Sequence, residues 1–155
     1  MKLLTSVDNL TKSLSGLIPE WFVAVIARLG IFFVFWSSVQ TKITGATLLG
    51  QKWMFWRITD STFMLFEYEY TVPLLPPDFA AYLATFCEFF LSIGIIIGLF
   101  TRMSAAGLLI LTLVIQFFVY PGEWPVHLLW TGLLLYLIKH GPGGISIDAL
   151  LLRRA

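Results

Sequence analysis

Two charged residues lie inside otherwise apolar stretches of the chain, where a charge needs a partner. Arg28 lies about 8 residues into the apolar run that begins near residue 20, roughly 12 Å deep at about 1.5 Å per residue. Glu88 lies about 12 residues, or roughly 18 Å, before the end of the next run. A charge near the centre of a bilayer costs about 2.5–3.5 kcal/mol and normally finds a partner. We therefore expect an Arg28–Glu88 ion pair, which either only fixes packing or forms a proton or ligand site.

A second group of polar residues falls near the ends of the apolar runs on the opposite side. This predicted outer polar cluster consists of Gln40, Lys42, Gln116, Tyr120, Glu123 and His127. Glu123 and His127 are four residues apart and share a helix face if their helix begins early enough. His127 can bind a metal or exchange protons with a quinone or a peptide. The alternative interpretation is a hydrogen-bonded histidine at the membrane interface.

The sequence contains no recognisable catalytic constellation. It shows no nucleophile with a base, no carboxylate pair and no glycine-rich phosphate loop. The single cysteine, Cys87, excludes an intrachain disulfide and a CxxC motif. No second histidine or cysteine has ligand spacing to His127. Met54 and Met64 can attract copper, but methionines in an aromatic-rich segment are more often packing residues. Quinone and copper therefore remain the possible cofactors. No catalytic residue and no metal site is assigned.

The elements that must position these residues are transmembrane helices. The chain is 58% hydrophobic and 12% charged, whereas a soluble domain has about 45–50% apolar and about 25% charged residues. Its mean hydropathy is +0.86, and its apolar residues gather into runs near the roughly 20 residues that a transmembrane helix needs. We predict a single all-α domain over residues 1–155, a polytopic membrane four-helix bundle that contacts membrane lipid. A net charge of +1 without a basic tract makes nucleic acid an unexpected partner.

Four membrane spans are predicted, at about residues 20–40, 79–100, 103–120 and 124–140. The fourth is the shortest, because its apolar part covers only 126–138 and needs Trp124 and Lys139 as interfacial anchors. The alternative is three spans and a re-entrant segment. In the second span, Gly94 and Gly98 form a GxxxG pair that permits close helix approach.

Residues 41–78 mix aromatic and charged side chains and are predicted to form an interfacial cap. The aromatic residues expected to face a protein or peptide partner are Trp53, Trp56, Phe66, Tyr68 and Tyr70. Short amphipathic helices are expected at both termini, because apolar residues recur at helical spacing over 3–18 and 147–152. Ser146 is placed to cap the second of them.

The distribution of basic residues predicts the orientation. With four spans, one side holds six basic residues and the other three. The richer side carries Lys2, Lys12, Arg102, Lys139, Arg153 and Arg154, and the poorer side carries Lys42, Lys52 and Arg57. The positive-inside rule then places both termini in the cytoplasm and the cap outside. The oligomeric state is not specified by any of these features.

Four short segments follow one another in a recognisable order. They are Arg28 and Gly30 followed by Lys42, then Glu88, then Gly98-Leu99-Phe100-Thr101-Arg102, and finally Gly141-Pro142-Gly143 with Ser146-Ile147-Asp148. Together they resemble the DoxX family of small bacterial membrane proteins, over most of residues 28–152. The resemblance implies a four-helix membrane fold and partners that are oxidoreductases or metal-handling proteins. The chain departs from the family at Ser37 and Ser38, where a glycine is common.

Residues 65–77 and 80–83 carry a more specific resemblance. They are similar to the DoxX-like branch associated with copper-binding, ribosomally made peptides and their maturation in Gram-negative bacteria. This resemblance implies an inner-membrane accessory protein that acts with partners in copper-binding peptide maturation, export or copper homeostasis. The alternative hypothesis is a quinone-linked membrane subunit of an oxidoreductase complex, with the quinone near Glu88 or His127.

Overall fold

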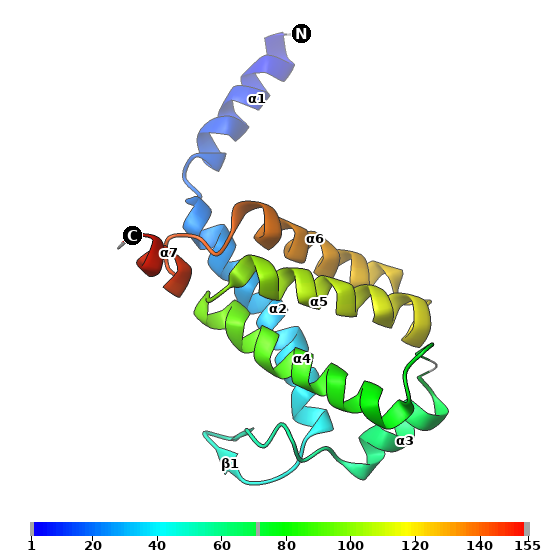
Figure 1. Cartoon of the computed structure of the whole chain (residues 1–155). Coiled ribbons are helices and arrows are strands. Elements are labelled where there is room, and N and C mark those ends of the chain that lie inside the picture. Colours follow the sequence, from blue (N-terminus) through cyan, green and yellow to red (C-terminus); the bar gives the residue numbers. More distant parts are fainter. Residues whose placement is uncertain (1, 71, 154–155) are drawn as a thin grey trace.

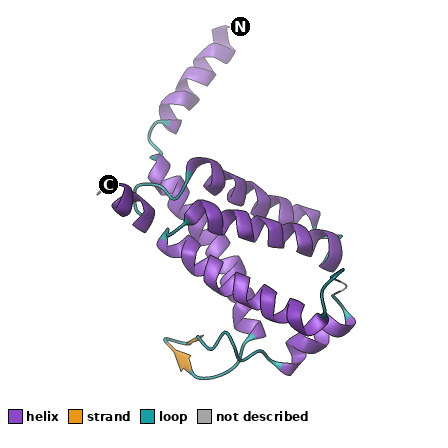
Figure 2. Ribbon diagram, in the orientation of Figure 1, coloured by secondary structure: helices purple, strands orange, loops and turns teal. Residues whose placement is uncertain are grey.

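A computed structural model describes residues 2–70 and 72–153 of the chain, which form a helical bundle (Figures 1 and 2). Its long helices are α2 (Glu20–Lys42), α4 (Pro77–Ile97), α5 (Thr101–Val114) and α6 (Trp124–His140). A π-helix, η1 (Ile115–Val119), continues α5 directly. α4 packs on α2 and α5, and α6 packs on α5 and α2, so the four helices close into a ring. The predicted all-α four-helix membrane bundle is confirmed.

Three of the helices described are long and apolar enough to cross a membrane, namely α2, α4, and α5 together with η1. α6 has 17 residues and is therefore about 25 Å long, somewhat less than the roughly 30 Å hydrocarbon core of a bilayer. Its bounds coincide with the predicted fourth span, but its full crossing stays a prediction. Large apolar side chains such as Phe33, Phe117 and Leu129 are exposed on the outside of the bundle, as contact with lipid requires.

The turn between α4 and α5 is built on two glycines that pack closely against other elements. A Cβ atom on Gly94 would lie 2.5 Å from Ser104 Oγ on α5, and one on Gly98 would lie 2.5 Å from Ser146 Cβ. Gly98 also has a φ of 70°, in the left-handed region that glycine tolerates best. The expected close helix approach is therefore confirmed at Gly94, whereas Gly98 packs against Ser146, just before α7, and against the Arg28 side chain.

The cap over residues 41–78 contains regular structure that the sequence analysis did not predict. A small antiparallel hairpin pairs β1 (Thr47–Leu48) with β2 (Gln51–Lys52). Helix α3 (Asp60–Tyr68) follows, capped by the Thr59 hydroxyl, which accepts from Thr62 N–H at 3.3 Å. α3 packs on α4 at the end of the bundle opposite the two termini (Figure 1).

Both predicted terminal helices are present, as α1 (Lys2–Ser15) and α7 (Ile147–Leu152). Ser146 caps α7 as expected, because its hydroxyl accepts a hydrogen bond from Ala149 N–H at 3.1 Å. α1 projects away from the bundle, and both terminal helices lie at the same end of it (Figure 1).

Arg28 is buried, but the predicted ion pair with Glu88 is wrong. The Arg28 guanidinium donates to the backbone carbonyls of Ile95 at 2.8 Å and Ile145 at 2.6 Å, and also to those of Ile96 and Pro142. The register of the antiparallel α2–α4 pair places Arg28 beside the C-terminal end of α4. Carbonyls there have no partner within the helix, so they accept its donors.

The segment after α6 completes this junction, which we call the Arg28 lock: Arg28, the end of α4 and residues 142–148. The Asp148 carboxylate accepts hydrogen bonds from Phe100 N–H at 2.8 Å and Thr101 N–H at 2.9 Å. Asp148 N–H donates to Gly98 O at 2.9 Å. One end of the bundle is thereby tied together by charge-assisted hydrogen bonds.

Replacing the buried arginine should destabilise the bundle. The Arg28→Gln variant leaves several carbonyls at the lock unpaired, and we expect a loss of roughly 3 kcal/mol in unfolding free energy. Arg102→Gln is the matched control, since exposed Arg102 also binds helix-end carbonyls, those of Ile138 and Lys139. We expect a loss below about 1 kcal/mol for this control. Unfolding in detergent measures both, and equal losses would contradict the central role of Arg28.

Candidate functional site

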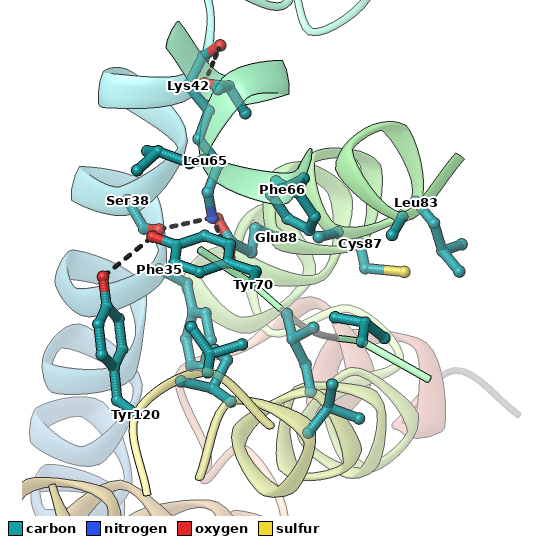
Figure 3. Close-up of a pocket in the computed structure, with 18 of the residues that line it drawn as sticks. Phe35, Ser38, Lys42, Leu65, Phe66, Tyr70, Leu83, Cys87, Glu88 and Tyr120 are labelled. Atoms are coloured by element: carbon teal, nitrogen blue, oxygen red, sulfur yellow. Dashed lines mark hydrogen bonds and ion pairs between the residues drawn. The ribbon is translucent and has the colours of Figure 1, made fainter. Parts of the chain in front are cut away.

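A cavity of about 600 Å³ lies at the cap end of the bundle (Figure 3). It is partly open and is lined by α2, α3, α4, α5 with η1, α6 and, between α3 and α4, by Tyr70, Val72 and Leu75. Most of its lining is apolar, as at Phe35, Leu83 and Ile110. Its polar lining includes Ser38, Lys42, Glu88, His127 and the tyrosines Tyr70 and Tyr120.

Lys42 and Glu88 form the ion pair at this cavity. Lys42 Nζ lies 2.5 Å and 2.6 Å from the two carboxylate oxygens of Glu88, and it donates to Ser38 Oγ at 2.9 Å. The Glu88 side chain is 2% exposed and that of Lys42 15%. Because the long lysine stem folds back along α2 past Ser38, one turn earlier, the ammonium group reaches the middle of α4. All three ammonium protons are used, and the two charges cancel.

Tyr70 and Tyr120 meet across the same cavity, with their hydroxyl oxygens 3.0 Å apart (Figure 3). Tyr70 lies two residues after the end of α3, whereas Tyr120 directly follows η1. Burial raises the pKa of the Tyr70 hydroxyl above its ordinary value, and the hydrogen bond with Tyr120 raises it further. Tyr70 is therefore neutral at physiological pH and adds no charge to the cavity.

His127 is held by Gln116, a buried side chain in η1. Nδ1 of His127 lies 2.6 Å from Oε1 of Gln116, and Nε2 of Gln116 donates to Pro121 O at 2.8 Å. The histidine ring also packs on Trp130, with ring centroids 4.8 Å apart. π-helical turns are rare and are frequent at functional sites. Here the turn places Gln116 where it fixes the orientation of the imidazole.

The predicted outer polar cluster forms only in part. Lys42, Tyr120 and His127 line the cavity, and Gln116 supports His127. Gln40 instead binds the hairpin, accepting from Lys52 N–H at 2.7 Å. Glu123 is exposed at the N-terminus of α6, where its carbonyl accepts from His127 N–H at 3.0 Å. Gln40 and Glu123 therefore lie outside the cavity.

The predicted partner-facing cap also divides into two groups. Trp56 is 58% exposed and Tyr68 is 74% exposed, and Trp53 is exposed as well. Phe66, however, is only 6% exposed and lines the cavity, so its predicted outward position is wrong. The reason is that α3 packs its Phe66 face on Ala80 and Ala81 of α4.

Ser38, Phe35 and Cys87 were not predicted as site residues, although all three line the cavity. The signal for Ser38 was its position one helical turn before Lys42, where a hydroxyl can receive the ammonium group. In the described part of the chain, no three or more histidine, cysteine, aspartate or glutamate side chains gather as a metal site would require.

The Lys42–Glu88 contact can be tested with a double-mutant cycle of Lys42→Met and Glu88→Gln. Each single change removes one partner of a buried pair, and we expect each to cost roughly 3 kcal/mol of unfolding free energy. The double variant should lose less than the sum of the two by roughly 2 kcal/mol, because neither charge then remains alone.

A second cycle, Arg28→Gln with Glu88→Gln, is the control. Arg28 and Glu88 do not touch, so their effects should add within about 0.5 kcal/mol. Additivity in the lysine cycle, or strong coupling in the arginine cycle, would overturn the observed pairing.

Comparison with known proteins identifies the family. The family model DoxX matches residues 23–121, which is more than half of the chain. No curated protein and no solved structure shows a significant match. The matched range contains Lys42, Glu88 and Gln116 of the cavity region and ends shortly before His127. The chain is therefore a membrane protein that belongs to the DoxX family.

Proposed function

We propose that this chain is a quinone-binding membrane subunit that works with a partner oxidoreductase. The observation that carries the proposal is the cavity of about 600 Å³ inside the bundle. Small-molecule sites typically enclose about 300–1,000 Å³, with an apolar lining and a few polar groups that fix orientation. The cavity has this size and composition, and exposed apolar helix faces surround it on a membrane protein.

The charges at the cavity favour a neutral ligand head. Lys42 and Glu88 neutralise each other, and Tyr70 is uncharged. A fatty-acid carboxylate or a lipid phosphate would compete with Glu88 for the lysine and leave one anion without a partner, which is costly in a buried site. A quinone head is neutral and hydrogen-bonds through its oxygens, while the isoprenoid tail suits the apolar lining at Phe35, Leu83 and Ile110.

Electron exchange with the quinone requires a partner protein. The chain has one cysteine, Cys87, and therefore no dithiol that could take part in two-electron disulfide exchange on its own. The partner oxidoreductase supplies the redox centre, and the DoxX chain supplies the membrane site for the quinone.

A second proposed function is an accessory role in copper-binding peptide maturation, export or copper homeostasis. It is supported by the exposed part of the cap, where Trp56 and Tyr68 offer a partner aromatic surface. A shallow apolar hollow of about 250 Å³ beside it includes Phe55, Trp56 and Tyr82 in its lining. Copper would be carried by the peptide, because the described residues bring no group of metal ligands together.

The proposed location is the bacterial inner membrane, with both termini in the cytoplasm and the cap outside. The six-to-three distribution of basic residues supports this orientation. The position of α1 and α7 at one end of the bundle, opposite the cap, is consistent with it (Figure 1).

Filling the cavity should abolish quinone binding. The Ala84→Trp variant introduces a large side chain into the cavity lining, and we expect at least about a 10-fold loss in affinity for decylubiquinone, measured by equilibrium titration of purified protein. Leu129→Trp is the control, since Leu129 is exposed and does not line the cavity. Its affinity should stay within about 2-fold of the unsubstituted protein. Absence of binding by the unsubstituted protein would end the quinone proposal.

The accessory function makes a separate prediction at the cap. We expect Trp56→Ala to weaken association with the copper-binding peptide and to lower copper tolerance in cells, because it removes an exposed aromatic contact. Trp21→Ala, an equivalent change near the opposite end, should leave both unchanged. If the purified protein and peptide do not associate, and deletion of the gene leaves copper tolerance unaltered, this second function is excluded.

A further inference from the structure

We infer that Nε2 of His127 accepts a hydrogen bond from a hydroxyl group of the cavity ligand, so that the site prefers a quinol to the corresponding quinone. This inference rests on the proposed quinone-binding function and adds to it the redox form of the ligand. It also assigns Gln116 as a positioning residue, which acts on the ligand only through His127.

The hydrogen bonds of Gln116 determine the tautomer of His127. Nε2 of Gln116 donates to Pro121 O at 2.8 Å, which places the oxygen of the amide, Oε1, on the side of the imidazole. Oε1 can only accept, so Nδ1 of His127, 2.6 Å away, carries the proton and donates. In the neutral ring the other nitrogen, Nε2, is then a hydrogen-bond acceptor.

Nε2 of His127 has no hydrogen-bond partner among the residues that the structure describes. Yet the only fully enclosed side-chain nitrogen or oxygen without a partner in the same residues is Oγ1 of Thr101, at the opposite end of the bundle. The unpartnered Nε2 is therefore not fully enclosed by the protein. His127 lines the cavity and Gln116 does not, so we place the ring edge directed away from Gln116 at the cavity.

A buried acceptor without a protein partner discriminates between the two redox forms of a quinone. A quinol hydroxyl donates a hydrogen bond to Nε2, whereas a quinone carbonyl offers only lone pairs and leaves the buried nitrogen unsatisfied. Sites built to bind a hydroxyl group reject analogues that lack it for this reason.

The other polar groups of the cavity do not reverse this preference. The strongest donor, the Lys42 ammonium group, already donates to both Glu88 oxygens and to Ser38. The Tyr70–Tyr120 pair leaves one hydroxyl proton free, and the Ser38 hydroxyl can rotate, so these groups can bind the second oxygen of either form. Discrimination therefore depends on His127.

The test compares the affinities of the purified, full-length protein for decylubiquinol and decylubiquinone, measured anaerobically by equilibrium titration. We expect the unsubstituted protein to bind the quinol about 5- to 10-fold more tightly, in line with one additional hydrogen bond. In His127→Asn the amide N–H can still donate to Gln116, but the acceptor at the Nε2 position is lost. The preference should then fall to about 1, because the quinol loses its additional hydrogen bond.

Two further measurements keep the inference testable if His127→Asn does not fold. The chain has two histidines, so ¹⁵N-histidine NMR can separate His127 from exposed His140 and should show Nδ1–H with an unprotonated Nε2. Gln116→Leu removes the acceptor that fixes this tautomer and should reduce the quinol preference at least about 2-fold, which a purely structural role for Gln116 would not do.

The outcomes separate the two levels of the proposal. If neither form binds the unsubstituted protein, the proposed function itself fails. If both forms bind equally, if His127→Asn keeps the preference, or if His127 carries its proton on Nε2, the inference is overturned while the quinone-binding function stands.

Discussion

The hydrogen bonds of the Arg28 guanidinium form the constraint on which the rest of the structure depends. A permanently charged group inside an apolar bundle must have its donors satisfied. Arg28 satisfies them with carbonyls at the end of α4 and in the segment after α6, so three parts of the chain distant in sequence meet at one point. The partial negative charge at the C-terminus of α4 further favours a cation there. Asp148 then joins the α4–α5 turn to the same point, so the close packing at Gly94 and Gly98 follows from the lock.

Because one end of the bundle is locked, internal space can persist at the other. α4 and α5 lie side by side near their tight turn and diverge towards the cap (Figure 1). α3, Val72 and Leu75 cover the resulting space, and inward-facing Phe66 and Tyr70 complete the wall of the cavity. The Lys42–Glu88 pair holds α2 and α4 together beside this space. The buried Arg28 and the partly buried Lys42 thus have different roles, since Arg28 closes the bundle and Lys42 keeps a polar site within it neutral.

The sequence predicts the parts of this structure that local physics determines. In lipid the backbone must satisfy its own hydrogen bonds, so long apolar runs become helices, and the bounds of α2, α4 and α6 lie close to those expected. The Ser146 cap follows from its neighbours in the chain alone. The partner of Glu88 does not follow from local sequence. Counting residues gives the depth of a side chain in the membrane only to within about one turn, and both Arg28 and Lys42 have long side chains. The inward position of Phe66 and the hairpin were not predicted, since the packing of α3 and a pair of two-residue strands leave little periodicity to detect.

The buried ion pair affects the chemistry of the cavity more than the stability of the fold. Replacing such a pair by apolar residues is often neutral or stabilising, so a net stabilising role is a weak reason for it. Its effect on a ligand is specific, because every Lys42 donor is already used. The hydroxyl groups and the His127 acceptor are then left to form hydrogen bonds with the ligand. α3 directs Phe66 into this cavity and Tyr68 towards the outside. A ligand in the cavity and a protein on the cap would therefore contact opposite faces of one short helix, which provides a direct physical route between membrane ligand and partner.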